Sequence, residues 1–143
     1  MQVKDVMTRG AEVVRPDATL QEAANKMKSL DIGPLPVCDG DKVIGMLTDR
    51  DITVRATAKG LDPKQTRVRE IMSKELTTCL EDQDVKEAAE LMQSKQIRRV
   101  PILNKDKRLV GMLSLGDLAQ RTQDSKLAGK TLEEVSTPGK SSH

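Results

Sequence analysis

Apolar residues recur at helical spacing in two segments of the chain, each about one helix long. In residues 19–30 the apolar positions fall at i, i+3, i+4, i+7 and i+10, and they are Leu20, Ala23, Ala24, Met27 and Leu30. Residues 84–94 repeat the spacing with Val85, Ala88, Ala89 and Met92. This period places the apolar side chains on one face, so each segment is predicted to be an amphipathic helix.

Polar residues mark where these two helices begin. Thr19 with Glu22, and Asp84 with Glu87, have the spacing of a capping box, in which each side chain bonds the other residue's backbone N–H. The pattern predicts helix starts directly after Thr19 and Asp84.

Short β-type runs surround each predicted helix. One precedes it, at residues 13–14 and again at 78–80. Two follow it, at 35–38 and 43–47 and again at 100–103 and 109–113, with turn residues between the members of each pair. A second helix is expected to start at Thr48 or Ser114. Each half of the chain therefore predicts the order β-α-β-β-α.

The two halves also match residue by residue. Shifting the sequence by 65 places VKDVMTR on VREIMSK and TLQEAANKMKS on DVKEAAELMQS, and a shift of 66 places GMLTDRDI on GMLSLGDL. Such ordered similarity indicates an internal duplication. We therefore expect a first repeat at 1–60, a linker at 61–67, a second repeat at 68–122 and a polar tail at 123–143. Within the tail, Thr131-Leu132-Glu133-Glu134 could open one more short helix.

A unit of about 60 residues buries little apolar surface by itself. We therefore expect an α+β fold in which the small mixed sheets of the two repeats pack together. The repeats would be related by a pseudo-two-fold axis, with clefts between them.

Composition removes several classes of function. The chain has no aromatic residue and a formal net charge of +2, which argues against a nucleic-acid partner that relies on base stacking or a basic face. Its one histidine is the last residue, His143, so histidine catalysis is not expected. No run approaches the roughly 18 apolar residues that span a bilayer, and the first residues lack a secretory h-region. We expect a cytoplasmic protein with no membrane partner.

Two cysteines, Cys38 and Cys79, have no neighbours at metal-ligand spacing. They are interpreted as small buried hydrophobes. A redox pair is an alternative if the fold brings the two thiols together.

Two features that occur once in each half carry a family resemblance. They are a strand of the form hydrophobic-Pro-hydrophobic, at 35–37 and 100–102, and the motif Gly-Met-Leu-[Thr/Ser]-x-x-Asp. The duplicated set resembles the cystathionine β-synthase (CBS) domain, and the tandem pair resembles a Bateman module over about residues 1–122. The resemblance implies clefts that bind adenosine-containing ligands such as AMP, ADP, ATP, S-adenosylmethionine or NAD. It also implies that modules pair into a homodimer.

The motif allows two interpretations, because [Ser/Thr]-x-x-[Asp/Glu] is also a helix-capping sequence. Aspartate is short for a box partner, and a carboxylate has two oxygens that suit a ribose diol. With the resemblance added, we expect Asp51 and Asp117 to bind ribose hydroxyls. Thr48 and Ser114 would cap the helix and lie beside the phosphate.

Arginines near the two motifs are candidate phosphate ligands, because a guanidinium presents a rigid fork of donors. Arg98 and Arg99 precede the second hydrophobic-Pro-hydrophobic strand, and Arg50 lies inside the first motif. Arg98 and Arg99 are also candidates for a solvated surface pair. Gly33 and Pro34 occupy the corresponding positions of the first repeat, so the two clefts are expected to differ, with one binding more tightly.

Apolar residues beside the short strands are candidates for a base pocket. They are Val14, Ile32, Leu35, Cys79, Ile97 and Val100. All six are equally good core residues.

The leading functional hypothesis is a regulatory sensor that binds an adenine nucleotide and signals to an unknown effector protein in trans. The alternatives are a ligand-free dimerisation scaffold and, third, a thiol switch. Catalysis ranks last, because the sequence shows no nucleophile–base pair and no metal cluster. We therefore expect no enzymatic activity, no catalytic residue and no catalytic cofactor.

Overall fold

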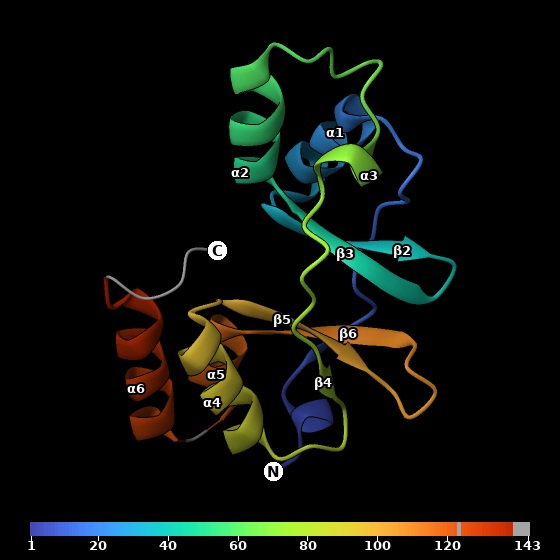
Figure 1. The fold of residues 1–143 in the computed structure, drawn as a ribbon. Helices are drawn as coiled ribbons and strands as arrows, with labels where there is room; N and C mark the ends of the chain where they lie inside the picture. Colours follow the sequence, from blue (N-terminus) through green and yellow to red (C-terminus); the bar gives the residue numbers. More distant parts are fainter. Residues whose placement is uncertain (123, 139–143) are drawn as a thin grey trace. The chain divides into compact units, whose positions relative to one another are not determined.

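The computed structural model of the chain describes residues 1–122 and 124–138, and it divides into two compact units (Figure 1). The first-repeat unit is Glu12–Leu76. The second-repeat unit joins Met1–Ala11 to the chain from Thr77 onward. Each unit packs helices on a small sheet, which confirms the predicted α+β class. None of the described helices is long and apolar enough to cross a bilayer.

The first-repeat unit is built on one antiparallel hairpin. Its elements are α1 (Leu20–Leu30), β2 (Pro34–Asp39), β3 (Lys42–Thr48), α2 (Asp49–Asp51), the helical turns η2 (Ile52–Ala56) and η3 (Thr57–Lys59), and α3 (Val68–Ile71). In the hairpin, Leu35 lies opposite Leu47. The predicted strand at 13–14 is reduced to a single parallel bridge between Val14 and Val37. Leu20, Leu35 and Leu47 are fully buried and form the centre of this unit's core.

The second-repeat unit contains a four-stranded sheet in the order β1-β6-β5-β4. Its elements are η1 (Val3–Asp5), β1 (Thr8–Arg9), β4 (Cys79–Leu80), α4 (Val85–Lys95), β5 (Arg99–Leu103), β6 (Leu109–Ser114), α5 (Leu115–Arg121) and α6 (Ser125–Ser136). Strand β1 pairs with β6, so residues from the start of the chain complete this sheet. In the structure, Met1–Ala11 therefore belongs to the same compact unit as the second repeat. In sequence, residues 3–9 of this segment match residues 68–74.

A glycine in each Gly-Met-Leu motif permits a close backbone contact. A Cβ atom on Gly45 would lie 2.7 Å from the carbonyl oxygen of Ser73, and one on Gly111 would lie 2.5 Å from that of Thr8. Both distances are too short for a real side chain. In the first-repeat unit the contact is closed by hydrogen bonds between Met46 and Ser73 in both directions. Glycine is therefore needed at both positions so that a passing segment can reach the hairpin.

The two predicted helix starts are correct, but the capping boxes form only in part. The Thr19 hydroxyl accepts from the Glu22 N–H at 3.1 Å, and it donates to the Glu22 carboxylate. At α4, Asp84 accepts from the Lys86 N–H at 2.8 Å, while the Glu87 carboxylate accepts from Gln83. Each glutamate is long enough to reach another donor, so neither makes the return bond to the cap residue's backbone.

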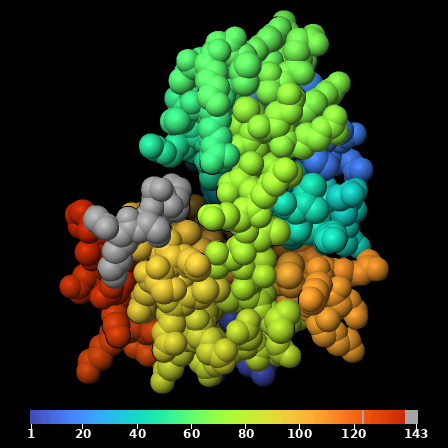
Figure 2. Space-filling view, viewed as in Figure 1, coloured from blue at the N-terminus to red at the C-terminus, as the bar shows by residue number. Residues whose placement is uncertain are grey.

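The segment predicted to be a polar tail forms a longer helix than expected. Helix α6 begins at Ser125, after the Asp124 side chain accepts from the Leu127 N–H at 2.9 Å. It lies alongside α4 in the space-filling view (Figure 2) and also packs on α5. Thr131 and Val135 are buried there, and the Gln93 side-chain amide donates to the Thr131 hydroxyl at 3.0 Å. This helix is therefore part of the second-repeat unit. Gln123 and residues 139–143 of the proposed tail lie outside the described residues.

Candidate functional site

Both copies of the Thr/Ser-x-x-Asp motif form complete capping boxes at the starts of α2 and α5. Thr48 accepts from the Asp51 N–H at 3.0 Å, and the Asp51 Oδ2 accepts from the Thr48 N–H at 2.9 Å. Ser114 and Asp117 repeat this arrangement at 3.0 and 2.9 Å. Aspartate was expected to be a less suitable box partner than glutamate, but both aspartates complete the box. The capping role accounts for one carboxylate oxygen of each aspartate.

The other oxygen of Asp51 faces an arginine one helical turn further on. Asp51 Oδ1 lies 3.9 Å from Arg55 Nε, and Arg55 Nη1 donates to the backbone carbonyl of Ile71 at 3.1 Å. Arg55 therefore links the motif carboxylate to the end of α3. The Asp51 side chain keeps 18% of its surface exposed.

The other oxygen of Asp117 has an equivalent arginine and one further partner. Asp117 Oδ1 lies 3.8 Å from Arg121 Nε, and Arg121 Nη1 donates to the Met7 carbonyl at 3.0 Å. The Thr8 hydroxyl also donates to Asp117 Oδ1, at 3.2 Å. The side chain of Asp117 is 10% exposed. A carboxylate offers about four lone-pair positions, so each aspartate retains capacity for a further donor.

Sequence reasoning missed Arg55, Arg121 and Thr8. A signal for the two arginines was present, because each lies four residues after its aspartate and they are 66 positions apart, as the motifs are. Thr8 gave no comparable signal, since only the fold brings the start of the chain beside Asp117. Together these groups fix the orientation of both carboxylates.

In the second repeat, the two arginines that were predicted to bind phosphate lie beside the second motif. Arg99 is paired with Ser114 in the β5–β6 register, and the Arg98 carbonyl accepts from the Leu115 N–H at 2.9 Å. Both arginine side chains are exposed. Arg50 is also exposed, but it belongs to the first-repeat unit, where it lies inside the first motif. The proposed phosphate ligands are therefore divided between the two units.

Four of the six residues proposed for a base pocket lie in the unit cores. Val14 and Leu35 belong to the first-repeat core, and Cys79 and Val100 belong to the second. Leu35 and Val100 have no exposed surface, as their interpretation as core residues predicts. Ile32 and Ile97 pack against the same cores and remain partly exposed. These two isoleucines are thus the members of the set that keep surface for a ligand.

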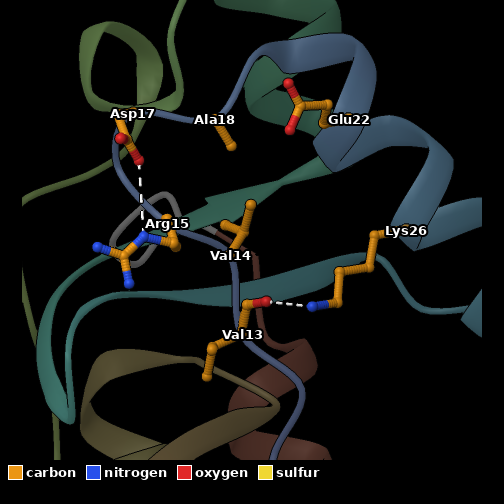
Figure 3. A pocket seen from close by; sticks show the side chains of 7 residues that line it. All are labelled: Val13, Val14, Arg15, Asp17, Ala18, Glu22 and Lys26. Atoms are coloured by element: carbon orange, nitrogen blue, oxygen red, sulfur yellow. Dashed lines mark hydrogen bonds and ion pairs between the residues drawn. The ribbon is translucent and has the colours of Figure 1, made fainter.

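A shallow hollow of about 390 Å³ lies on the first-repeat unit, between residues 13–18 and helix α1 (Figure 3). It is lined by Val13, Val14, Arg15, Asp17, Ala18, Glu22 and Lys26. The Lys26 ammonium donates to the Val13 carbonyl at 2.5 Å, and Arg15 lies 3.7 Å from Asp17. Its charges are mixed and already engaged, so the hollow does not offer a site for an anion. Of the residues proposed for ligand binding, it includes only Val14.

The two thiols are buried in separate units, at 2% exposure for Cys38 in β2 and 3% for Cys79 in β4. Burial, with a smaller contribution from Asp41, raises the pKa of Cys38. Burial and the nearby Glu87 carboxylate raise the pKa of Cys79 to about 11. Because the thiolate is the reactive form, both cysteines are poorly suited to a thiol switch.

We expect alkylation of Cys79 by iodoacetamide at pH 8 to be about a hundredfold slower in the native protein than in urea. A pKa of about 11 leaves correspondingly less thiolate than an unfolded thiol has, and the rate should rise with pH up to that value. A Cys38→Ser variant isolates the reaction, which mass spectrometry can follow. Equal rates in native and unfolded protein would restore the thiol-switch hypothesis.

Within residues 1–122 and 124–138, no three histidine, cysteine, aspartate or glutamate side chains gather closely enough to hold a metal ion.

The antiparallel hairpin, the capped motif and the arginine four residues after each motif aspartate are arranged alike in both halves. The CBS-domain family profile matches this chain twice, at residues 3–56 and 68–124. The chain belongs to the CBS-domain family.

Relatives of this CBS protein extend over nearly its whole length. The CBS domain-containing protein YhcV of Bacillus subtilis is 44% identical over 134 residues, which cover 94% of each chain. The crystal structure of Hypoxic Response Protein I with two coordinated zinc ions superposes with a TM-score of 0.77. It is 36% identical and covers 85% of this chain and 99% of its own.

A third CBS relative has a named ligand. The CBS domain pair of protein MJ0100 was solved in complex with 5′-methylthioadenosine and S-adenosyl-L-methionine. It has a TM-score of 0.73 and 27% identity, and the match covers 84% of this chain and 94% of that one. Some CBS pairs therefore bind adenosine-containing molecules.

Proposed function

We propose that this CBS pair is a regulatory module that binds an adenine nucleotide such as AMP, ADP or ATP and signals to a partner protein in trans. The observation that carries the proposal is the second motif. There, an oriented carboxylate, Asp117, lies in the same unit as two exposed arginines, Arg98 and Arg99, that adjoin the capping serine.

The chemistry of these groups suits a nucleotide. Asp117 would accept hydrogen bonds from the ribose diol, and its remaining lone pairs are directed by the cap, Thr8 and Arg121. Arg98 and Arg99 would bind the phosphate, because guanidinium donors form paired hydrogen bonds with phosphate oxygens. The complex of MJ0100 supports an adenosine-type ligand. The partly exposed Ile97 would contact the base of that ligand. For the first motif, we propose the same ribose role for Asp51 and base contact for Ile32.

We expect Asp117→Asn to weaken AMP binding at least tenfold, because a hydrogen bond to a charged group contributes about 1.5–3 kcal/mol. Isothermal titration calorimetry measures the loss. Asparagine can still accept from the Ser114 N–H, so the cap should persist. Asp106→Asn, an exposed change in the β5–β6 turn, is the matched control. The urea midpoint of each variant checks the fold.

Unchanged affinity in both Asp117→Asn and Asp51→Asn would overturn the ribose assignment. If the wild-type chain binds no adenine compound, the alternative is a ligand-free interaction scaffold. A relative of this fold, a CBS-CP12 protein of bloom-forming cyanobacteria, is hexameric. For this chain we propose a homodimer, which light scattering with and without AMP would test.

A further inference from the structure

The backbone makes two positions of the two repeats strictly comparable. The Gly33 carbonyl accepts from the Asp49 N–H at 3.1 Å, and the Arg98 carbonyl accepts from the Leu115 N–H at 2.9 Å. Gly33 is thus the counterpart of Arg98, and Asp49 is the counterpart of Leu115. Each pair lies directly beside its capped motif.

At the first motif, an acid occupies the space that a basic side chain enters at the second. A Cβ atom built on Gly33 would lie 3.1 Å from Asp49 Oδ1. The Asp49 carboxylate therefore lies where the Arg98 side chain leaves the backbone in the other repeat. The Arg50 N–H donates to the same oxygen at 3.0 Å, which orients the carboxylate.

The two motif regions consequently differ in charge. Beside Ser114, the exposed Arg98 precedes β5 and the exposed Arg99 begins it, and α5 starts with an uncharged Leu115 and Gly116. Beside Thr48, Gly33 precedes β2 and Pro34 begins it, and α2 starts with Asp49. Arg50 follows and offsets one charge, so the first region lacks the excess of positive charge that the second has.

We infer that Asp49 is a specificity-determining residue that disfavours phosphate at the first motif. This motif then takes adenosine compounds without a phosphate group, such as adenosine itself or a cationic adenosyl sulfonium, while the second motif takes nucleotides. A phosphate within about 4 Å of Asp49 would meet a like charge, which weakens binding about fivefold even in a water-like dielectric. The inference rests on the proposed function and assigns a separate ligand class to each motif.

The test compares AMP with adenosine, which differ only in the phosphate, by calorimetric titration of the full chain. The wild-type chain should bind two adenosines, whereas AMP should bind tightly at one site and at least about fivefold more weakly than adenosine at the other. Asp49→Asn should raise AMP affinity at the first motif about fivefold or more and leave adenosine affinity unchanged. Asp39→Asn, an exposed change in the same hairpin, is the matched control and should alter neither.

A second variant assigns the sites. Arg98→Ala combined with Arg99→Ala should abolish the AMP site and keep adenosine binding at the first motif. Two equal AMP sites in the wild-type chain, or an Asp49→Asn variant with unchanged AMP affinity at the first motif, would each overturn the inference while the proposed function stands. Absence of binding by both compounds would overturn both.

Discussion

Gly111→Val should reduce the free energy of unfolding by about 1–3 kcal/mol, the range for forcing extra atoms into a packed site. A Cβ atom there would lie 2.5 Å from the Thr8 carbonyl oxygen, and the neighbouring atoms in contact are backbone and the Met7 sulfur. The backbone of β1 must move away to accept valine. That movement would separate β1 from β6 and shift Thr8, which donates to Asp117.

Urea denaturation followed by far-ultraviolet circular dichroism measures the loss. Gly129→Ala is the matched control, because this glycine lies inside α6 with no atom within 4 Å of an added Cβ. The alanine should stabilise the helix by about 0.5–1 kcal/mol. If Gly111→Val unfolds at the same urea concentration as the wild-type chain, the close contact with Thr8 is not required. AMP titration of the same variant would show whether the displacement reaches Asp117.

Local sequence signals predicted the elements that are formed by neighbouring residues. The helix starts at Leu20 and Val85 followed from the spacing of apolar residues and from the caps Thr19 and Asp84. The hairpins followed from alternating β-formers around Gly40 or Asn104. These interactions span a few residues, so the sequence carries them directly.

Contacts between distant segments could not be predicted in the same way. Strand β1 contains two residues, Thr8 and Arg9, which is too short for a periodic pattern. Its pairing partner lies more than 100 positions away, at Gly111 and Met112. The packing of α6 on α4 could not be predicted either. It involves polar residues such as Gln93, whose sequence pattern is typical of an exposed helix face.

The sequence identified the motif residues but not their geometry, and their role in ligand binding stays a prediction. Asp51 and Asp117 were selected because the motif is repeated, and both complete the cap although aspartate was expected to be a less suitable partner than glutamate. The structure adds the groups that face the Oδ1 atom of each aspartate, namely Arg55 and Arg121. The sequence did not indicate a role for Asp49, because its position beside Gly33 is visible only in the structure.

Hydrogen bonds from one buried glutamine at the end of α4 help to hold α6 in place. The Gln96 side chain is 2% exposed, and its amide donates to the backbone carbonyls of Glu134 and Thr137. A buried amide that loses its partners destabilises the fold by about 1–3 kcal/mol. Correct seating of α6 therefore matters for the polar interior as well as for the apolar contacts of Val135.

Val135→Asp should therefore reduce the free energy of unfolding of the second-repeat unit by about 3 kcal/mol. The valine is 5% exposed, and its replacement removes a buried apolar side chain and introduces a charge that needs water. Hydrogen exchange should show lost protection in α6 and α4, with β2 and β3 of the first-repeat unit unchanged. Leu132→Asp on the same helix is the control, because Leu132 is 47% exposed and should tolerate the charge. If α6 and α4 are as well protected from exchange in Val135→Asp as in Leu132→Asp and the wild-type chain, α6 contributes nothing to the stability of the unit. The buried amide of Gln96 would then need another partner.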